Sequence, residues 1–125
     1  MKKAFVSENA PRPVGPYSQI VEASGFLFLA GQIPLTPEGK MNDGDVVEQT
    51  RQVLNNLRSV LEAAGSSMNA VVKTTIFLED LGDFETVNKI YAEYFQEPFP
   101  ARSTVEVSKL PKGARLEMDA IAVRS

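Results

Sequence analysis

The 125-residue sequence contains no cysteine, no histidine and no tryptophan. Without cysteine, the chain has no disulfide, no thiol nucleophile and no thiolate ligand for a metal. Without histidine, it lacks the most common general base and the most common zinc ligand, and a Ser-His-Asp triad is excluded. Any catalysis by this chain must therefore use Arg, Lys, Glu, Asp, Tyr, Ser, Thr and backbone groups.

Long hydrophobic runs and an excess of positive charge are also missing. The longest wholly apolar run near the N-terminus covers residues 26–30, which is too short for a membrane span or a signal-peptide core. We therefore expect an unprocessed cytoplasmic protein without a membrane partner. The net charge of −3 and the pI of about 5.0 argue against nucleic-acid binding as the main activity.

The length and the hydrophobic pattern predict one domain over residues 1–125, with the element order β-β-β-α-β-α-β-β. Strands are expected over residues 3–7, 18–23, 26–30 and 70–78, from about Arg102 onward, and over residues 115–123. The first helix begins after Asp45, which is a good N-cap, and stops at Gly65. Asp83 is expected to cap the second helix, which ends near residue 95.

This order predicts an α+β fold in which six strands form a sheet and two helices cover one face. Yet every residue in 26–30 is apolar, which predicts a strand that is covered on both faces. The last expected strand also has apolar side chains on both sides, with Leu116 and Met118 on one side and Ile121 and Val123 on the other. Because two helices cannot cover both faces, we infer a homo-oligomer in which a second copy covers the open face.

The segment around Arg102 carries the strongest functional signal. Pro100 fixes its own φ angle and sets the direction in which the chain enters the following strand. The planar guanidinium of Arg102 suits a carboxylate and stays charged at any working pH. After a Pro-Lys-Gly turn, the next strand is expected to bring Glu117 back toward the same end. Together, Arg102 and Glu117 would form a small hydrolytic site, with a cation for an anionic substrate and a carboxylate that could hold a water. The alternative is a structural Arg102–Glu117 ion pair between neighbouring strands.

Several separate motifs, in the same order along the chain, resemble the RidA/YjgF family of reactive-intermediate (enamine/imine) deaminases. They are Gly15-Pro16-Tyr17-Ser18-Gln19, Gly31-Gln32-Ile33-Pro34, Asp80-Leu81 with Phe84 and Val87-Asn88, Pro100-Ala101-Arg102-Ser103, Val105-Glu106-Val107, Leu110-Pro111-Lys112 and Leu116-Glu117-Met118. The resemblance implies a chorismate-mutase-like fold and a compact homotrimer with its sites in clefts between subunits. It also implies hydrolysis of 2-iminopropanoate and 2-iminobutanoate to 2-keto acids and ammonia, with no cofactor and no metal.

The resemblance also assigns roles to the matching residues of this chain. Arg102 would bind the substrate carboxylate, and Glu117 would orient and polarise the attacking water. Tyr17 would complete the catalytic group, while Asn88 would line the pocket and the backbone N–H of Gly31 would help to hold the carboxylate. From the residues alone, Tyr17 would instead be a packed loop aromatic and Asn88 a solvated helix position.

Two positions depart from the family pattern. Many relatives carry cysteine where this chain has Thr104, and serine where it has Ala30. The resemblance gives residue 104 a role in substrate binding through its backbone carbonyl, which would accept a hydrogen bond from the imine nitrogen. Threonine satisfies that role, whereas a requirement for a thiol would remove the activity. Ala30 would alter the size of the pocket and the substrate preference.

Three other functions stay open. The same cleft could hold a small carboxylate without chemistry, as a regulatory binding module. An endoribonuclease or translation-inhibitor activity is also attributed to family members, but only the basic residues Lys109, Lys112 and Arg115 favour RNA contact, and we interpret them as a solvated turn. A chaperone-like holdase has no specific feature in its favour.

Overall fold

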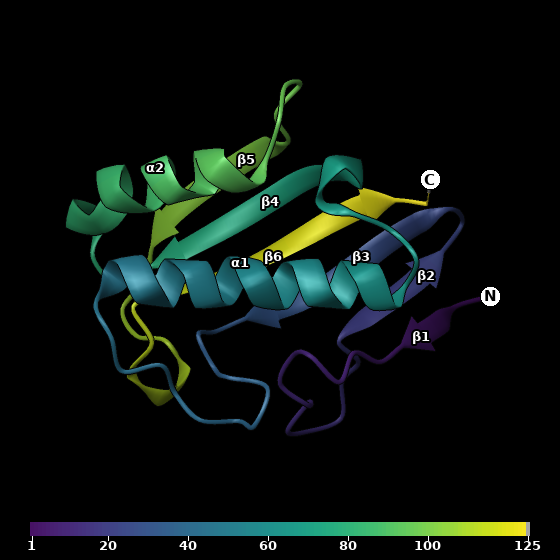
Figure 1. Cartoon of the computed structure of the whole chain (residues 1–125), viewed down its shortest axis with the longest axis horizontal. Helices are drawn as coiled ribbons and strands as arrows, with labels where there is room; N and C mark the ends of the chain where they lie inside the picture. Colours follow the sequence, from purple (N-terminus) through teal and green to yellow (C-terminus); the bar gives the residue numbers. More distant parts are fainter. Residues whose placement is uncertain (125) are drawn as a thin grey trace.

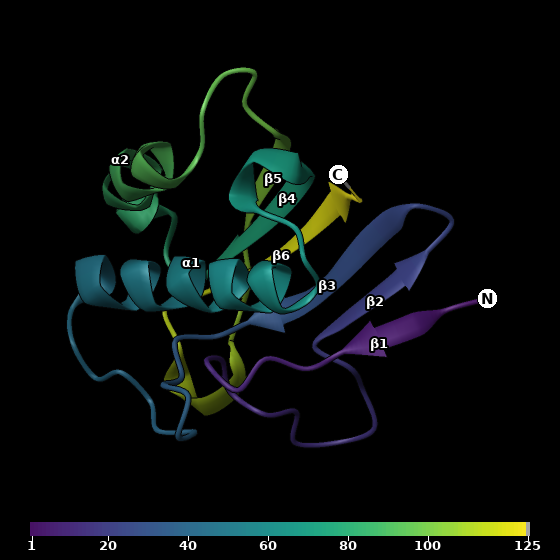
Figure 2. The ribbon, with the colours of Figure 1, turned by 45° about the vertical axis from the view of Figure 1, so that its right-hand side comes forward.

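Over residues 1–124, six strands and two α-helices form two layers, as the sequence pattern predicts (Figure 1). The structure is a computed structural model and describes residues 1–124. Its elements are β1 (Lys3–Phe5), β2 (Ile20–Ala23), β3 (Phe26–Gln32), α1 (Val46–Ala63), β4 (Val71–Leu78), α2 (Phe84–Tyr94), β5 (Ala101–Glu106) and β6 (Leu116–Val123), with 3-10 turns at Met68–Ala70, Leu81–Asp83 and Pro111–Gly113. Both views place the two helices on the same face of the sheet (Figure 2). The predicted α+β class and the one-sided helix layer are therefore confirmed.

The strands do not lie in the sheet in chain order. Their order is β1-β2-β3-β6-β4-β5, so the last strand of the chain lies between β3 and β4. All neighbours are antiparallel except β4 and β5, which are parallel because α2 carries the chain back between them. β4 therefore separates β5, which carries Arg102, from β6, which carries Glu117. The expectation that these two residues lie on neighbouring strands is wrong.

The alternation along β6 explains how the sheet packs on the helices. Leu116, Met118, Ala120 and Ala122 are buried against the helix layer, and the residues between them face the other side. The same core includes the apolar stripe of α1, which consists of Val53, Leu54, Leu57, Val60 and Leu61. Burying a large aliphatic side chain stabilises a fold by about 1.5–3 kcal/mol relative to leaving it exposed. This shared core makes the sheet a fixed base for side chains on both of its faces.

The opposite face of the sheet is uncovered in the single chain. Phe26 and Phe28 of β3 are 45% and 44% exposed, and Val105 of β5 is 42% exposed. The expectation that residues 26–30 are covered on both faces is therefore wrong for one chain, because their side chains alternate between the core and the open face. An exposed apolar surface of this kind is typical of a site for another molecule.

The starts of the two helices show one correct and one incorrect prediction. Asp45 caps α1, and its carboxylate accepts a hydrogen bond from a backbone N–H of the first turn at 3.0 Å. Asp83 makes no side-chain capping bond to α2. Instead the carboxylate of Asp80 accepts from the N–H of Gly82 at 2.8 Å and caps the 3-10 turn that leads into α2. The chain is thus already helical when it reaches Asp83.

Among residues 1–124, no helix is both long and apolar enough to cross a membrane. The same part of the chain contains no group of three or more His, Cys, Asp or Glu side chains placed to hold a metal ion.

Candidate active site

Arg102 lies on the helix side of the sheet, near the start of β5. It pairs with Thr74 of β4, which is buried under the helices, so both side chains point toward the helix layer. Nη1 of Arg102 donates a hydrogen bond to Oδ1 of Asn88 on α2 at 2.6 Å. The guanidinium also lies over the rings of Phe84 and Tyr91, 5.5 and 5.0 Å from their centroids. These contacts hold the cation in one place.

The side chains that support Arg102 are themselves fixed. The hydroxyl oxygens of Tyr91 and Thr74 are 2.8 Å apart and hydrogen-bonded, and both residues are buried. Burial raises the pKa of Tyr91, so its phenol stays neutral. Beside the guanidinium, a hollow of about 440 Å³ opens between α2 and the segment Phe99-Pro100. No carboxylate among residues 1–124 forms an ion pair with Arg102, so a small anion in this hollow would meet an uncompensated cation.

Thr104 lies two residues after Arg102 and on the same side of β5. Within residues 1–124, its buried hydroxyl oxygen Oγ1 has no hydrogen-bond partner. β5 is an edge strand, so part of its backbone is also unpaired within the chain. The Thr104 carbonyl, which we expect to accept a hydrogen bond from the imine nitrogen, therefore lies on a strand with free backbone acceptors.

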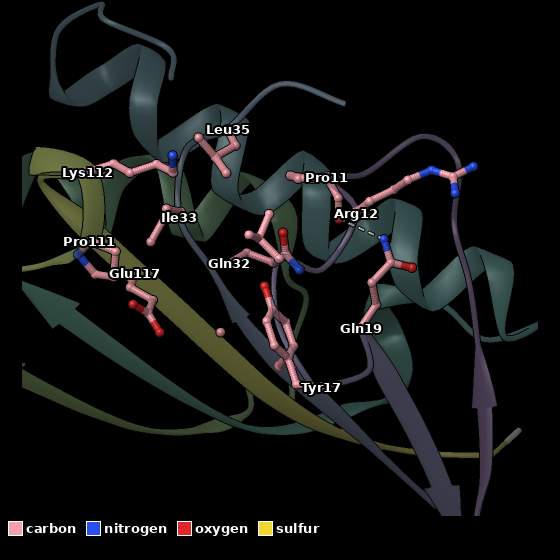
Figure 3. A pocket seen from close by; sticks show the side chains of 13 residues that line it. Pro11, Arg12, Tyr17, Gln19, Gln32, Ile33, Leu35, Pro111, Lys112 and Glu117 are labelled. Atoms are coloured by element: carbon pink, nitrogen blue, oxygen red, sulfur yellow. Dashed lines mark hydrogen bonds between the residues drawn. The ribbon is translucent and has the colours of Figure 1, made fainter. Parts of the chain in front are cut away.

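Glu117 lies on the open face of the sheet, near the start of β6, and lines a pocket of about 570 Å³. Tyr17 and Gly31 line the same pocket, so three of the predicted site residues come together there (Figure 3). The other lining residues are Pro11, Arg12, Val14, Gln19, Ala30, Gln32, Ile33, Leu35, Pro111 and Lys112. Burial, and to a smaller extent the nearby Asp119 carboxylate, raise the pKa of Glu117. A carboxyl group with a raised pKa can exchange a proton closer to neutral pH.

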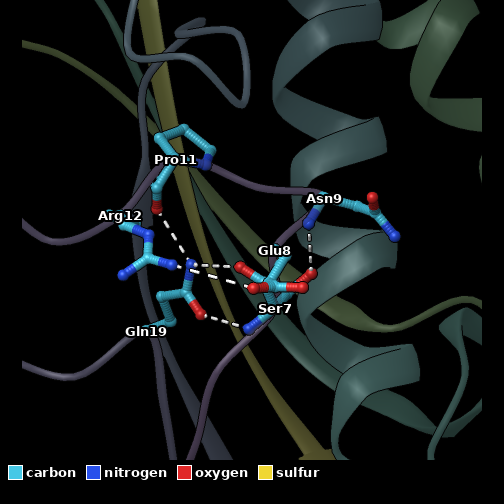
Figure 4. Close-up of polar contacts among 6 residues, drawn as sticks. All are labelled: Ser7, Glu8, Asn9, Pro11, Arg12 and Gln19. Atoms are coloured by element: carbon cyan, nitrogen blue, oxygen red, sulfur yellow. Dashed lines mark hydrogen bonds and ion pairs between the residues drawn. The ribbon is translucent and has the colours of Figure 1, made fainter.

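The proline-rich loop over residues 8–17 forms one wall of this pocket, and Gln19 holds it in place. Nε2 of Gln19 donates to the carbonyl oxygens of Ser7 and Pro11 at 3.2 and 2.9 Å, and its Oε1 accepts from the Ser7 N–H at 2.6 Å (Figure 4). The Gln19 side chain is buried. The sequence pattern predicts a strand from residue 18, whereas β2 begins at Ile20. Gln19 is thus a pocket residue that the sequence pattern does not reveal.

Lys112 also borders the pocket, from the 3-10 turn before β6. Its φ of 56° lies in the left-handed region, and the turn places Pro111 and Lys112 close to Ile33 at the pocket wall (Figure 3). The interpretation of this segment as a solvated basic turn is incomplete, because Lys112 is exposed but also adds positive charge at the pocket rim.

The predicted site residues therefore fall into two groups. The Arg102 half-site comprises those on the helix side of the sheet: Asn88, Arg102 and Thr104. The Glu117 half-site comprises those at the open-face pocket: Tyr17, Gly31 and Glu117. Arg102 faces the helices together with Thr74, whereas Glu117 pairs with Phe77 and faces away from them. A hydrolytic site that joins Arg102 and Glu117 within one chain is therefore ruled out, and so is the Arg102–Glu117 ion pair.

Known proteins resemble this chain over its whole length. A family model described as Endoribonuclease L-PSP matches residues 7–124. A RutC family protein of Pyrococcus horikoshii is 54% identical over 125 residues, which cover 99% of each chain. The 2-iminobutanoate/2-iminopropanoate deaminase of Escherichia coli K12 is 46% identical over 127 residues, with the same coverage of 99% on both sides.

Solved structures agree with the fold. The structure of Escherichia coli TdcF with bound serine matches with a TM-score of 0.91 at 41% identity, and the match covers 98% of this chain and 99% of that one. The sequence motifs, the fold and these relatives lead to one conclusion. The chain belongs to the Endoribonuclease L-PSP family, which is the RidA/YjgF family that its motifs predict.

Proposed function

We propose that this protein hydrolyses reactive 2-imino acids, such as 2-iminopropanoate and 2-iminobutanoate, to 2-keto acids and ammonia. The complementary chemistry of the two half-sites is the observation that carries the proposal. The Arg102 half-site offers a fixed cation beside a hollow, and the Glu117 half-site offers a partly buried carboxyl group in a pocket. The name of the Escherichia coli relative, which is an imine deaminase, supports the same reaction.

The proposed site needs two copies of the chain, because Arg102 and Glu117 face opposite sides of one sheet. We place the site in a cleft where the Arg102 half-site of one copy meets the Glu117 half-site of its neighbour. The exposed rings of Phe26 and Phe28 give the copies an apolar surface on which to pack. Because the two half-sites are different surfaces, their contact is head-to-tail, and a closed ring such as a homotrimer would contain equal sites.

The proposed chemistry uses few groups because an imine is already electrophilic. Arg102 binds the substrate carboxylate through two N–H donors. Glu117 takes a proton from a water as the water oxygen bonds to the carbon of the N-protonated imine, whose C=N electron pair moves onto nitrogen. The Glu117 carboxyl group then gives this proton to the nitrogen of the resulting carbinolamine, and the C–N bond breaks with its electron pair on nitrogen. Ammonia leaves, and loss of the hydroxyl proton gives the keto acid.

The other residues of the half-sites position these groups. Asn88 accepts a hydrogen bond from Arg102 and so orients its guanidinium. In the proposed complex, the Thr104 carbonyl accepts from the imine nitrogen, the Gly31 N–H donates to the substrate carboxylate, and Tyr17 closes the pocket. Fixed donors and acceptors of this kind stabilise developing charge without reorganising at the moment of reaction.

A regulatory binding module is the second candidate function. The serine in the TdcF structure favours it, because serine is a small carboxylate of about the size of the proposed substrate. Both candidates require Arg102, but only the hydrolase requires the carboxyl group of Glu117. An endoribonuclease is less well supported, because a phosphate near Glu117 would also meet the Asp119 carboxylate and the chain has no histidine.

A trapping assay tests the proposal. 2-Iminobutanoate is generated from threonine with a dehydratase and captured by semicarbazide, and the protein is added as a competitor of the trap. We expect the wild type to compete and Arg102→Ala to lose about 30- to 1,000-fold in kcat/KM, because the lost charge-assisted contact is worth about 2–4 kcal/mol. Glu117→Gln should keep binding a keto acid but lose turnover.

Arg58→Ala is the matched control for Arg102→Ala. Arg58 also donates a hydrogen bond to an asparagine, Asn55, and lies over a tyrosine ring, that of Tyr94, but it lines neither pocket of the half-sites. Its loss should leave the trapping rate unchanged. A wild type that binds serine or a keto acid through Arg102 but never competes with semicarbazide would contradict the deaminase and support the binding module.

A further inference from the structure

β3 contains one extra residue where it passes β6 near Glu117. Three steps along β3 from Leu29 to Gln32 correspond to two steps along β6, so Ala30 and Gly31 form a bulge. Gly31 does not have a positive φ angle. The local backbone conformation therefore does not require a glycine at this position.

The neighbouring Glu117 side chain does require it. A Cβ atom built on Gly31 would lie 2.9 Å from Cδ and 3.2 Å from Cγ of Glu117, and closer still to its Oε2. Such separations are shorter than van der Waals contact. The carboxylate of Glu117 therefore occupies the space that any side chain at position 31 would fill.

We propose that Gly31 is a positioning residue for Glu117: its missing side chain lets the carboxylate lie directly against β3, partly buried and facing the pocket. This proposal rests on the deaminase function and adds a reason for glycine at this position. Every residue except proline has a backbone N–H. Donating a hydrogen bond to the substrate through this group therefore does not by itself require glycine.

The surroundings of Glu117 determine what a displacement of its carboxylate would do. Asp119 lies next to it on β6, Lys112, Arg12 and Tyr17 line the same pocket, and β4 carries Lys73 on the same face, where its Nζ donates to the Ser103 hydroxyl. Phe77 of β4 is the register partner of Glu117, and on β3 the backbone of Gly31 lies against its carboxylate. Burial is the main cause of the raised Glu117 pKa, so moving the carboxylate into water should lower that pKa toward its ordinary value.

Gly31→Ala tests the proposal because it adds one Cβ atom and keeps the backbone N–H. The atoms that this Cβ meets belong to the end of a flexible side chain, so we expect the variant to fold with nearly the wild-type melting temperature. The kcat for imine hydrolysis should fall about 10- to 100-fold with little change in KM, since loss of an aligned general base acts on turnover. The acid limb of the kcat profile should move to lower pH.

Gly44→Ala is a matched control. A Cβ on Gly44 would lie 2.7 Å from Cδ and 2.9 Å from Cβ of Glu48, so this substitution also displaces a glutamate carboxylate and, because the Glu48 Cβ is fixed by α1, should lower the melting temperature more than Gly31→Ala. Gly44 and Glu48 line neither half-site pocket. We expect its kcat and pH profile to match those of the wild type.

The double variant Gly31→Ala/Glu117→Gln shows whether Gly31 acts through Glu117. If it does, the double variant is no slower than Glu117→Gln. The proposal would be overturned if the fold-losses in kcat of the two single variants multiplied in the double variant. It would also be overturned if the melting temperature of Gly31→Ala fell well beyond that of Gly44→Ala.

An NMR titration of the Glu117 carboxyl carbon separates this proposal from the proposed function, because it needs no substrate. A lower titration midpoint in Gly31→Ala than in the wild type supports the positioning role, and equal midpoints overturn it. If the wild type is inactive toward imines, the deaminase proposal fails while the titration still decides the role of Gly31.

Discussion

The two half-sites hold their charged groups in different ways. Arg102 is fixed by what surrounds it, namely the Asn88 amide oxygen and two aromatic rings. Glu117 is shielded by burial and lies where its neighbour Gly31 has no side chain. A cation that only binds can be held by its neighbours before the substrate arrives, as long as other N–H donors stay free. A carboxyl group that has to exchange protons must keep its oxygens available.

The largest effect on activity is expected when two inactive variants are mixed. This experiment tests whether the two half-sites act together across two copies of the chain. Arg102→Ala and Glu117→Gln are unfolded together and refolded as a mixture. If the site joins half-sites of two copies, about a quarter of the interfaces regain both groups by random pairing, and activity returns from near zero. The trapping assay with semicarbazide measures this recovery.

Each variant refolded alone is the control for the mixture. A mixture as inactive as its two components, although size-exclusion chromatography shows mixed oligomers, would mean that the half-sites of different copies do not combine.

Gln19→Leu sharpens the comparison by changing the support of one half-site only. It removes the hydrogen bonds from Gln19 to Ser7 and Pro11 and leaves their backbone groups unpaired. An unpaired buried polar group costs about 1–3 kcal/mol, so thermal melting should occur several degrees lower. KM should rise as the pocket wall loosens, whereas the contact between Arg102 and Asn88 should persist.

Gln52→Leu provides the comparison for Gln19→Leu. Its Nε2 donates to Asn56 on the same helix, and it lines neither half-site pocket. Since Gln52→Leu also leaves the buried Asn56 Oδ1 unpaired, KM is the deciding measurement: a KM unchanged in both variants would show that Gln19 does not hold the loop.

The smallest expected effect concerns the stability of the folded chain and its dependence on pH. Burial raises the pKa of Glu117, so its ionised form is less favourable in the folded state than in the unfolded state. The contribution of Glu117 to the free energy of unfolding is greatest at low pH, where the group is protonated. It is lost as the pH rises through the raised pKa. Glu117→Gln cannot ionise and should therefore melt slightly above the wild type at about pH 7, with the difference vanishing below about pH 4.

Differential scanning calorimetry of both proteins across this pH range measures the difference. A constant gap between the two melting temperatures at every pH would mean that packing, and not ionisation, separates them.

The sequence predicts most of the elements because their hydrophobic patterns are local. Leu116 and Met118 alternate with Glu117, which correctly places Glu117 away from the core. The β5 sequence alternates as well, but polar Arg102 and Thr104 lie on the helix side and Val105 lies on the open face, so the hydrophobic pattern could not assign its faces. Strand order is not a local property either, because it depends on packing between distant segments.

Gln19 was missed for a related reason. A glutamine after a proline-rich loop has the same local pattern whether it is solvated or buried. Its partners at Ser7 and Pro11 become neighbours only when the loop folds back over the sheet. The burial of its side chain is therefore visible only in the structure.

The bulge in β3 has a consequence for how related sequences can diverge. The Ala30 backbone N–H is still anchored, since it donates to the Gln19 carbonyl at 2.9 Å, but Ala30 has no register partner on β6. Its side chain lines the pocket and is only partly buried. Mutations at position 30 can therefore accumulate without compensating changes in the core. Selection can act on substrate choice at this position while the inherited fold stays intact.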